Sequence, residues 1–355
     1  MEHTIEINWP DGSQQSLSRL WLRDNCRCPE CRIAQTEEKQ FQIASLEDTD
    51  YEATILADDK ALHITWANGH QSHFEREFID RGHQIPKIDW KPWAQDFEPK
   101  RFDFNAFIYD DKAASGAIES FLVDGVLILT DSPTEPNTLE QLAPRLGPIR
   151  EVLFERIHNV KVDPKGYNVA HTSLGLPPHN DFASYTWPPS VQALHMLVNE
   201  STGGHSTVLD GWGLLEDFRA AEPTAFEVLC RVEVPFREFD ADNETFTCAP
   251  MIQLDSQGML KVFRYSNQLM QTLDPTARDT IEFYNAYYKL SKRVLNSNFQ
   301  RHFRLDGGQI LIVASHRILH GRKEITSAGA RHLQDAYFEH DNVRNMLSVL
   351  ERRHA

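Results

Sequence analysis

The segment Pro178-His179-Asn180-Asp181-Phe182 places an imidazole and a carboxylate two residues apart. On a β-strand, side chains at positions i and i+2 point to the same face, so His179 and Asp181 are expected to converge. Two ligands leave a metal coordination sphere incomplete, and the late segment 317–322 offers His320 as a third. Two histidines and one carboxylate form the facial triad of non-heme Fe(II) oxygenases, which leaves positions open for a cosubstrate and O2.

A cationic residue, Arg331, lies eleven residues after His320. A guanidinium pairs bidentately with a carboxylate, so Arg331 suits a dicarboxylate cosubstrate. The triad together with Arg331 therefore favours a hydroxylating dioxygenase. A non-catalytic barrel that serves as an assembly module is the second hypothesis, and a zinc hydrolase on the same ligands is a more distant one.

Composition narrows the class of protein. A length of 355 residues predicts two domains or one large domain with an appendage. The chain is 41% hydrophobic and 25% charged, which is typical of a soluble globular protein. A formal net charge of −16 argues against a nucleic-acid partner, because phosphate binding needs a basic face. No apolar run approaches the roughly 18 residues of a membrane span. The first residues lack the pattern of a signal peptide, so we expect a cytoplasmic protein that acts on a small molecule.

Three of the five cysteines, Cys26, Cys28 and Cys31, fall within six residues. An odd, clustered set is a poor disulfide framework and a better metal site in a reducing compartment. Three thiols and one imidazole make a closed, structural zinc site. From the residues alone, the fourth ligand is either His70 or His73.

The pattern along the chain predicts two domains, residues 1–95 and 96–355, separated by a connector rich in proline and tryptophan. The first reads as a small β-rich unit with alternating strands at 4–9 and 61–66. In the second, we expect strand–turn–strand over 121–129, strands at 191–198 and 309–314, and helices at 138–146, 211–219, 223–231 and 275–300. The fold class is mainly β with flanking helices, a double-stranded β-helix or jelly roll.

The motifs, taken in order, resemble one family. They are His179-x-Asp181, the segment 203–211 (Gly-Gly-His-Ser-Thr-Val-Leu-Asp-Gly), Arg264-Tyr265-Ser266-Asn267, and the segments 317–322 and 330–337. These are similar to the γ-butyrobetaine dioxygenase and trimethyllysine dioxygenase family, within the taurine dioxygenase superfamily of Fe(II)/2-oxoglutarate enzymes. The segment 21–28 resembles the zinc-binding N-terminal domain of that family. The matching pattern Trp66-x-x-Gly69-His70 implies that His70, rather than His73, completes the zinc site.

The resemblance implies roles for individual residues. His179, Asp181 and His320 would hold iron, and Arg331 would bind the distal carboxylate of 2-oxoglutarate. Leu194 and Ser206 would make further cosubstrate contacts. Fe(II), 2-oxoglutarate, O2 and structural Zn(II) are the implied cofactors, with ascorbate as reductant. The resemblance also implies a homodimer that forms through the N-terminal domain.

The substrate pocket of the family binds a trimethylammonium group in an aromatic cage, which acts by cation–π attraction. The residues that match pocket positions here are Asn168, Asn267, Tyr337, His171, Phe182 and Phe154. The last three replace tyrosines of the family. Phenylalanine keeps much of the attraction, whereas histidine weakens it. The resemblance thus implies hydroxylation of γ-butyrobetaine or a related trimethylammonium acid or phosphonate, as in carnitine biosynthesis, with a non-cationic acid or amino acid as the alternative.

Overall fold

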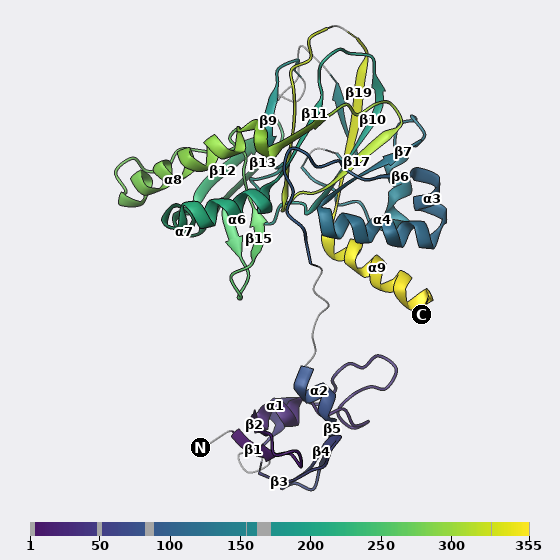
Figure 1. Cartoon of the computed structure of the whole chain (residues 1–355), viewed down its shortest axis with the longest axis vertical. Coiled ribbons are helices and arrows are strands. Elements are labelled where there is room, and N and C mark those ends of the chain that lie inside the picture. The colour runs from purple at the N-terminus through teal and green to yellow at the C-terminus, as the bar shows by residue number, and fades with distance from the viewer. Residues whose placement is uncertain are drawn as a thin grey trace. The chain divides into compact units, whose positions relative to one another are not determined.

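The structure is a computed structural model that describes residues 4–47, 52–81, 89–153, 155–161, 172–327 and 329–354. Contacts divide the chain into two compact units, residues 1–87 and 88–355 (Figure 1). The sequence predicts the boundary at 95, whereas Trp93 already belongs to the second unit. Its backbone N–H donates to Asp210, and its indole N–H donates to the carbonyl of Asp124.

The N-terminal unit contains two small antiparallel sheets, β1–β2 and β3–β4–β5. Alternation along β4 buries Leu62, Ile64 and Trp66 and exposes His63 and Thr65, as expected for a strand that covers a core on one face. Its elements are β1 (Thr4–Asn8), β2 (Gln14–Ser18), α1 (Arg19–Asp24), η1 (Ile43–Ser45), β3 (Ala53–Ala57), β4 (Ala61–Trp66), β5 (Gln71–Glu75) and α2 (Arg76–Arg81).

The second unit is built on two sheets that enclose an apolar interior. The larger sheet has the strand order β6 (Arg101–Asp103), β7 (Val126–Thr130), β17 (Gln309–Ala314), β10 (Val191–Asn199), β19 (Arg331–Phe338), β8 (His158–Lys161). The smaller sheet has the order β16 (Gln300–Phe303), β11 (Ser206–Asp210), β18 (Ile318–Arg322), β9 (Leu176–His179). Leu194, Val208 and Leu311 meet in the interior core. This mainly β architecture agrees with the predicted jelly roll.

Helices cover the outside of this barrel. One cluster packs α3 (Phe104–Tyr109), α4 (Asp111–Asp124) and α9 (His340–His354) against the outer face of the larger sheet. A second cluster joins α6 (Gly211–Ala221), α7 (Pro223–Arg231) and α8 (Arg278–Val294) to the hairpins β12–β13 (Val234–Phe239, Glu244–Ala249) and β14–β15 (Ile252–Leu254, Leu260–Phe263). The remaining elements are η2 (Thr138–Leu142), α5 (Ala143–Leu146) and η4 (Ser297–Phe299). Among the described residues, no helix has the length and apolar character needed to cross a membrane.

Two predictions about these elements need correction. The strand–turn–strand prediction for 121–129 is wrong, because α4 continues to Asp124 and Gly125 ends it in the left-handed region at φ 76°. A short apolar run does not distinguish a buried helix from a strand by period alone. Helix 275–300 is shorter than predicted, and its apolar residues do not share one buried face: Ile281 and Tyr288 are exposed, whereas Phe283 is buried.

Candidate active site

The chain turns sharply between the first two candidate ligands. Strand β9 ends at His179, so Asp181 lies in the turn beyond it rather than on the predicted strand. The buried Asn180 fixes this turn: its amide donates to the carbonyl of Ser315, and its side-chain oxygen accepts from the backbone N–H of Tyr265. The middle residue of the motif therefore anchors the turn in the protein while its two neighbours face the pocket.

The three predicted ligands meet in space. Nε2 of His179 lies 3.3 Å from Oδ1 of Asp181, and Nε2 of His320 lies 3.8 Å from Oδ2 of Asp181. The ligand atoms all fall within 4.8 Å of one another. The register of the smaller sheet explains this, because His320 on β18 pairs directly with His179 on β9. The donor set of two imidazoles and one carboxylate fits a non-heme Fe(II) ion.

The protonation of these groups suits metal binding. Nδ1 of His179 lies 2.9 Å from the carbonyl of Pro177, which places the ring N–H there and leaves the Nε2 lone pair for a metal. Burial lowers the pKa of His320 to about 4, so this imidazole is neutral. Burial alone would raise the pKa of Asp181, but the neighbouring His320 and His179 and the hydroxyl of Tyr337 outweigh burial and lower this pKa.

Two donors from the larger sheet hold the other oxygen of the carboxylate. Gln192 donates from Nε2 to Oδ2 of Asp181 at 2.7 Å, and the hydroxyl of Tyr337 donates to the same oxygen at 2.8 Å. Both donors also lie 3.3 Å from Oδ2 of Asp335. Since Oδ2 accepts both bonds, Oδ1 is the freer oxygen for a metal.

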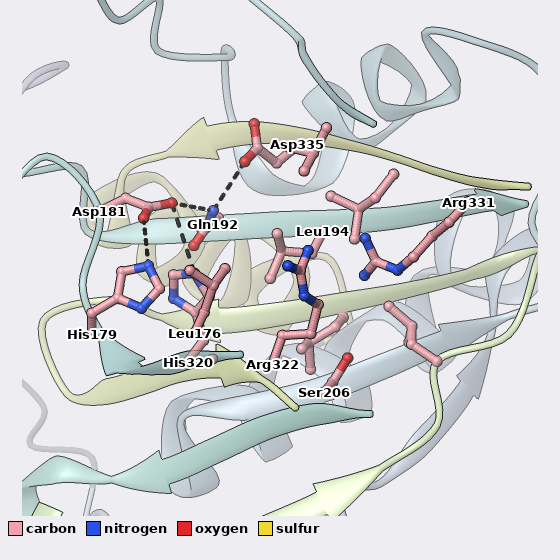
Figure 2. Close-up of a pocket in the computed structure, with 15 residues that line it drawn as sticks. Leu176, His179, Asp181, Gln192, Leu194, Ser206, His320, Arg322, Arg331 and Asp335 are labelled. Carbon is pink, nitrogen blue, oxygen red and sulfur yellow. Dashed lines mark hydrogen bonds and ion pairs between the residues drawn. The ribbon is translucent and has the colours of Figure 1, made fainter. Parts of the chain in front are cut away.

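The triad lies at one end of a pocket between the two sheets, and Arg331 lies at the other (Figure 2). Burial, with the nearby charges of Arg322 and Arg304, lowers the pKa of Arg331 to about 10. Within the described part of the chain, Nε of Arg331 is buried without a hydrogen-bond partner, and no carboxylate forms an ion pair with this guanidinium. A buried cation of this kind fits an anionic ligand such as a carboxylate.

The lining of the pocket follows the alternation of the strands, since residues two apart share a face. The predicted cosubstrate contacts Leu194 and Ser206 both belong to it. Arg322 also lines the pocket and donates to the carbonyls of Thr172 and Leu174. The whole lining consists of Val160, Leu176, His179, Asp181, Gln192, Leu194, Ser206, Leu305, Leu311, His320, Gly321, Arg322, Arg331, Leu333 and Asp335.

Aromatic rings gather beside the triad. The ring centroid of Phe182 lies 5.0 Å from that of Tyr337, edge to face, and 5.1 Å from that of Tyr185. His158 lies 6.1 Å from Phe182 and 6.0 Å from Tyr337. Phe182 has φ 51°, a left-handed backbone that is costly for a bulky residue and often found at functional sites. Two predicted pocket residues, Phe182 and Tyr337, therefore lie together next to the ligands.

Other predicted pocket residues do not join them. Phe154, Asn168 and His171 lie outside the described residues. Asn267 is exposed, accepts a hydrogen bond from the hydroxyl of Tyr287 at 2.9 Å, and is not part of the described pocket lining.

The predicted zinc ligands of the N-terminal unit also converge. Nε2 of His70 lies 3.3, 3.7 and 3.6 Å from the sulfurs of Cys26, Cys28 and Cys31. Glu30 lies 3.3 Å from Nδ1 of His70, which would fix the ring proton away from the sulfurs. The donor set of three thiols and one imidazole fits a tetrahedral zinc ion. His73 is not part of this cluster, and its Nε2 lies 3.0 Å from Oε1 of Glu75.

Sequence reasoning missed three residues of the site, Gln192, Asp335 and Tyr185. Gln192 and Asp335 are buried polar residues of β10 and β19. Asp335 also shares a strand face with Arg331 and Tyr337 by its spacing of four and two residues. A buried carboxylate in that register was a signal that could have been used. Tyr185 carried no comparable signal.

Comparisons with known proteins agree with this geometry. Residues 89–337 match the model of the taurine catabolism dioxygenase TauD, TfdA family, and residues 1–79 match the gamma-butyrobetaine hydroxylase-like N-terminal family. The non-heme iron oxygenase OrfP, solved with Fe and alpha-ketoglutaric acid, has a similar fold, with a TM-score of 0.50 and 15% identity over 64% of this chain and 80% of OrfP. The chain thus belongs to the TauD, TfdA class of dioxygenases, and the donor set of its site fits an Fe(II) ion.

Individual proteins with similar sequences identify the family within this class of dioxygenases. Gamma-butyrobetaine dioxygenase of Pseudomonas sp. (strain AK-1) is 31% identical over 360 residues, covering 98% of this chain and 94% of the relative. The human gamma-butyrobetaine dioxygenase is 25% identical, covering 99% and 95%. Mitochondrial trimethyllysine dioxygenase of Bos taurus is 25% identical, covering 93% and 82%. The chain belongs to the γ-butyrobetaine dioxygenase and trimethyllysine dioxygenase family.

Proposed function

We propose that this dioxygenase hydroxylates an aliphatic C–H bond of γ-butyrobetaine or of a related trimethylammonium acid or phosphonate. The observation that carries the proposal is the aromatic cluster of Phe182, Tyr185 and Tyr337 beside the triad. Ring faces attract a quaternary ammonium group, which offers no hydrogen bond. Relatives named gamma-butyrobetaine dioxygenase over nearly the whole chain support the same substrate class.

In this proposal His179, Asp181 and His320 hold the iron. Tyr337 and Gln192 both donate to Oδ2 of Asp181, so Oδ1 would be the oxygen available to an iron ion. When bound, Fe(II) with 2-oxoglutarate supplies the activation of O2 and the hydroxylation, with release of succinate and CO2.

Arg331 binds the distal carboxylate of 2-oxoglutarate, and Leu194 and Ser206 contact the rest of that molecule. The buried guanidinium without a described carboxylate partner supports this assignment. The apolar lining from Leu311 and Leu333 excludes water around the cosubstrate.

The N-terminal unit holds zinc on Cys26, Cys28, Cys31 and His70, a closed site with a structural role. A homodimer, a cytoplasmic location, the division into a zinc domain and a catalytic domain, and ascorbate as reductant stay predictions from the family resemblance.

The substrate proposal is tested by substrate-stimulated O2 uptake with Fe(II), 2-oxoglutarate and ascorbate. The panel pairs γ-butyrobetaine and a trimethylammonium phosphonate with isosteres in which a tert-butyl group replaces the ammonium. We expect uptake with the cations and little with the neutral isosteres. Equal uptake with both members of each pair, or uptake only with non-cationic acids or amino acids, would overturn the assignment of the aromatic cluster to a cation.

A further inference from the structure

Two histidines face each other on the exposed side of the N-terminal sheet. His63 on β4 pairs directly with His73 on β5, in a region where the two strands lie side by side (Figure 1). Their Nδ1 atoms are 3.2 Å apart, and their ring centroids are 4.7 Å apart. Both residues are exposed, on the opposite face from the buried Leu62 and Phe74. The pair is therefore no part of the hydrophobic core.

The outer nitrogens of both rings are already engaged by carboxylates. Nε2 of His63 lies 3.1 Å from Oδ2 of Asp58, and Nε2 of His73 lies 3.0 Å from Oε1 of Glu75. A neutral imidazole carries one proton, and a carboxylate acceptor draws that proton to Nε2. With the proton of each ring on Nε2, both Nδ1 atoms carry lone pairs and lie 3.2 Å apart. Lone pairs at this distance repel unless a positive charge lies between them.

One of the two carboxylates, Asp58, is held in place by the backbone. Oδ1 of Asp58 accepts the backbone N–H groups of Lys60 and Ala61, each at 2.8 Å, so that Oδ2 is left for His63. These bonds and His63 hold the pKa of Asp58 below its usual range. The arrangement is the carboxylate–histidine–metal pattern in which an outer carboxylate orients a ligating ring.

The spacing of the two nitrogens matches chelation of one ion. With metal–nitrogen bonds of about 2.0–2.1 Å, two nitrogens 3.2 Å apart subtend roughly 100° at the ion, which suits tetrahedral, square-planar or octahedral geometry. We propose that His63 and His73 form a two-histidine site for a divalent transition-metal ion of the Ni²⁺, Cu²⁺ or Zn²⁺ class, with water in the remaining positions. The site is separate from the four-ligand cluster, because His70 lies among the cysteines and His73 does not.

Nickel binding to the full-length chain tests the site. The zinc-loaded protein is dialysed against Ni²⁺ with 2-oxoglutarate present, and bound nickel and zinc are counted by elemental analysis. We expect two nickel ions per chain, one in the iron triad and one on the histidine pair. His320→Ala should lose the first alone, which separates failure of the iron assignment from failure of the pair.

The variants of the pair distinguish a chelate from two independent histidines. His63→Ala, His73→Ala and the double variant should each lose the same single nickel ion, because removing either arm of a chelate weakens binding by about a hundredfold. Glu75→Ala should weaken binding by about tenfold. The exposed His354, at the end of α9, provides the control, and His354→Ala should bind as wild type does.

The result that overturns the proposal is equally clear. If wild type and the double variant bind the same number of nickel ions, the two Nδ1 atoms share only a proton. If each single variant lost only part of the bound nickel and the double variant lost the sum of the two, the histidines would bind independently rather than as a chelate. Unchanged bound zinc and an unchanged melting temperature in the variants show that the hairpin is still folded, so neither outcome reflects unfolding.

Discussion

The hydroxyl of Tyr337, on strand β19 of the larger sheet, donates a 2.8 Å hydrogen bond to Oδ2 of Asp181, in the turn after β9 of the smaller sheet. The bond crosses the pocket and ties the carboxylate to the opposite wall. Gln192 reinforces it, because Gln192 pairs with Tyr337 in the register of β10 and β19 and donates to the same oxygen. Tyr337, which we propose contacts the substrate, thus also orients the carboxylate that we propose as an iron ligand.

Removing this hydroxyl should weaken iron binding while the ring remains. We expect Tyr337→Phe to lower the affinity for Fe(II) by about tenfold, a typical cost of losing an outer hydrogen bond to a metal ligand. Titration of Fe(II) under anaerobic conditions measures it. Tyr185→Phe is the matched control, since Tyr185 joins the same aromatic cluster without bonding Asp181. Equal iron affinity in Tyr337→Phe and wild type would show that the bond does not orient the ligand.

The guanidinium of Arg331 should govern the affinity for 2-oxoglutarate. Hydrogen bonds to charged groups contribute about 1.5–3 kcal/mol, so Arg331→Gln should raise the KM for 2-oxoglutarate by roughly 10–100-fold. Steady-state kinetics at saturating substrate measure this change. Arg237→Gln, on the exposed side of β12, serves as control and should leave the KM unchanged. A KM unaltered in Arg331→Gln would place the cosubstrate elsewhere.

Loss of zinc should unfold the N-terminal unit. A structural zinc site supplies much of the folding free energy of a small domain. In Cys28→Ser we therefore expect loss of bound zinc and loss of amide hydrogen-exchange protection over β4 and β5, with protection of β10 and β17 retained. Cys230→Ser, a substitution in α7, should retain both zinc and protection. If β4 and β5 kept their hydrogen-exchange protection after zinc was lost, the metal would have no structural role.

Acid should destabilise the second unit through His195. This histidine is fully buried beside the hydroxyl of Ser132, and burial lowers its pKa from 6.5 to about 4. The unfolded chain binds the proton more readily, so stability is full above pH 6.5 and falls as the pH drops toward 4. From pH 7 to pH 5 the loss is about 2 kcal/mol.

Denaturant unfolding of wild type and His195→Asn at pH 7 and pH 5 isolates this contribution from that of other histidines. The variant should lose less stability between the two pH values, whatever its absolute stability. An equal loss in both proteins would mean that His195 is not buried in its neutral form.

Spacing predicted which residues lie close together, because few residue types bind metals and their motifs are short. His179, Asp181, His320 and Arg331 line one pocket, and Cys26, Cys28 and Cys31 lie around His70, which the family resemblance rather than spacing selected over His73. The predicted reason for the meeting of His179 and Asp181, that both lie on one face of a strand, was only partly right. Asp181 reaches the site through a turn held by Asn180, a long-range contact with Ser315 that no local pattern reveals.

The errors in the fold have a common physical cause. Apart from Asp124 and Gly125, the run 121–129 is apolar because the end of α4 and β7 are both buried, so its spacing does not distinguish helix from strand. Gly125, which ends the helix, was the available signal. Gln192 and the donor role of Tyr337, which was predicted only as a pocket residue, were missed because the two residues come together through the pairing of β10 with β19, which are distant in sequence.

The iron site is tested most directly by measuring bound iron and succinate in one preparation. Wild type, His320→Ala and His205→Ala, an exposed histidine just before β11, are reconstituted anaerobically with Fe(II) and then given 2-oxoglutarate, O2 and γ-butyrobetaine. Wild type and His205→Ala should hold one iron per chain at the triad and form succinate in a substrate-dependent way, whereas His320→Ala should lose both iron and succinate. Iron retained in His320→Ala, with succinate formed at the rate of wild type, would contradict a metal centre built from His179, Asp181 and His320.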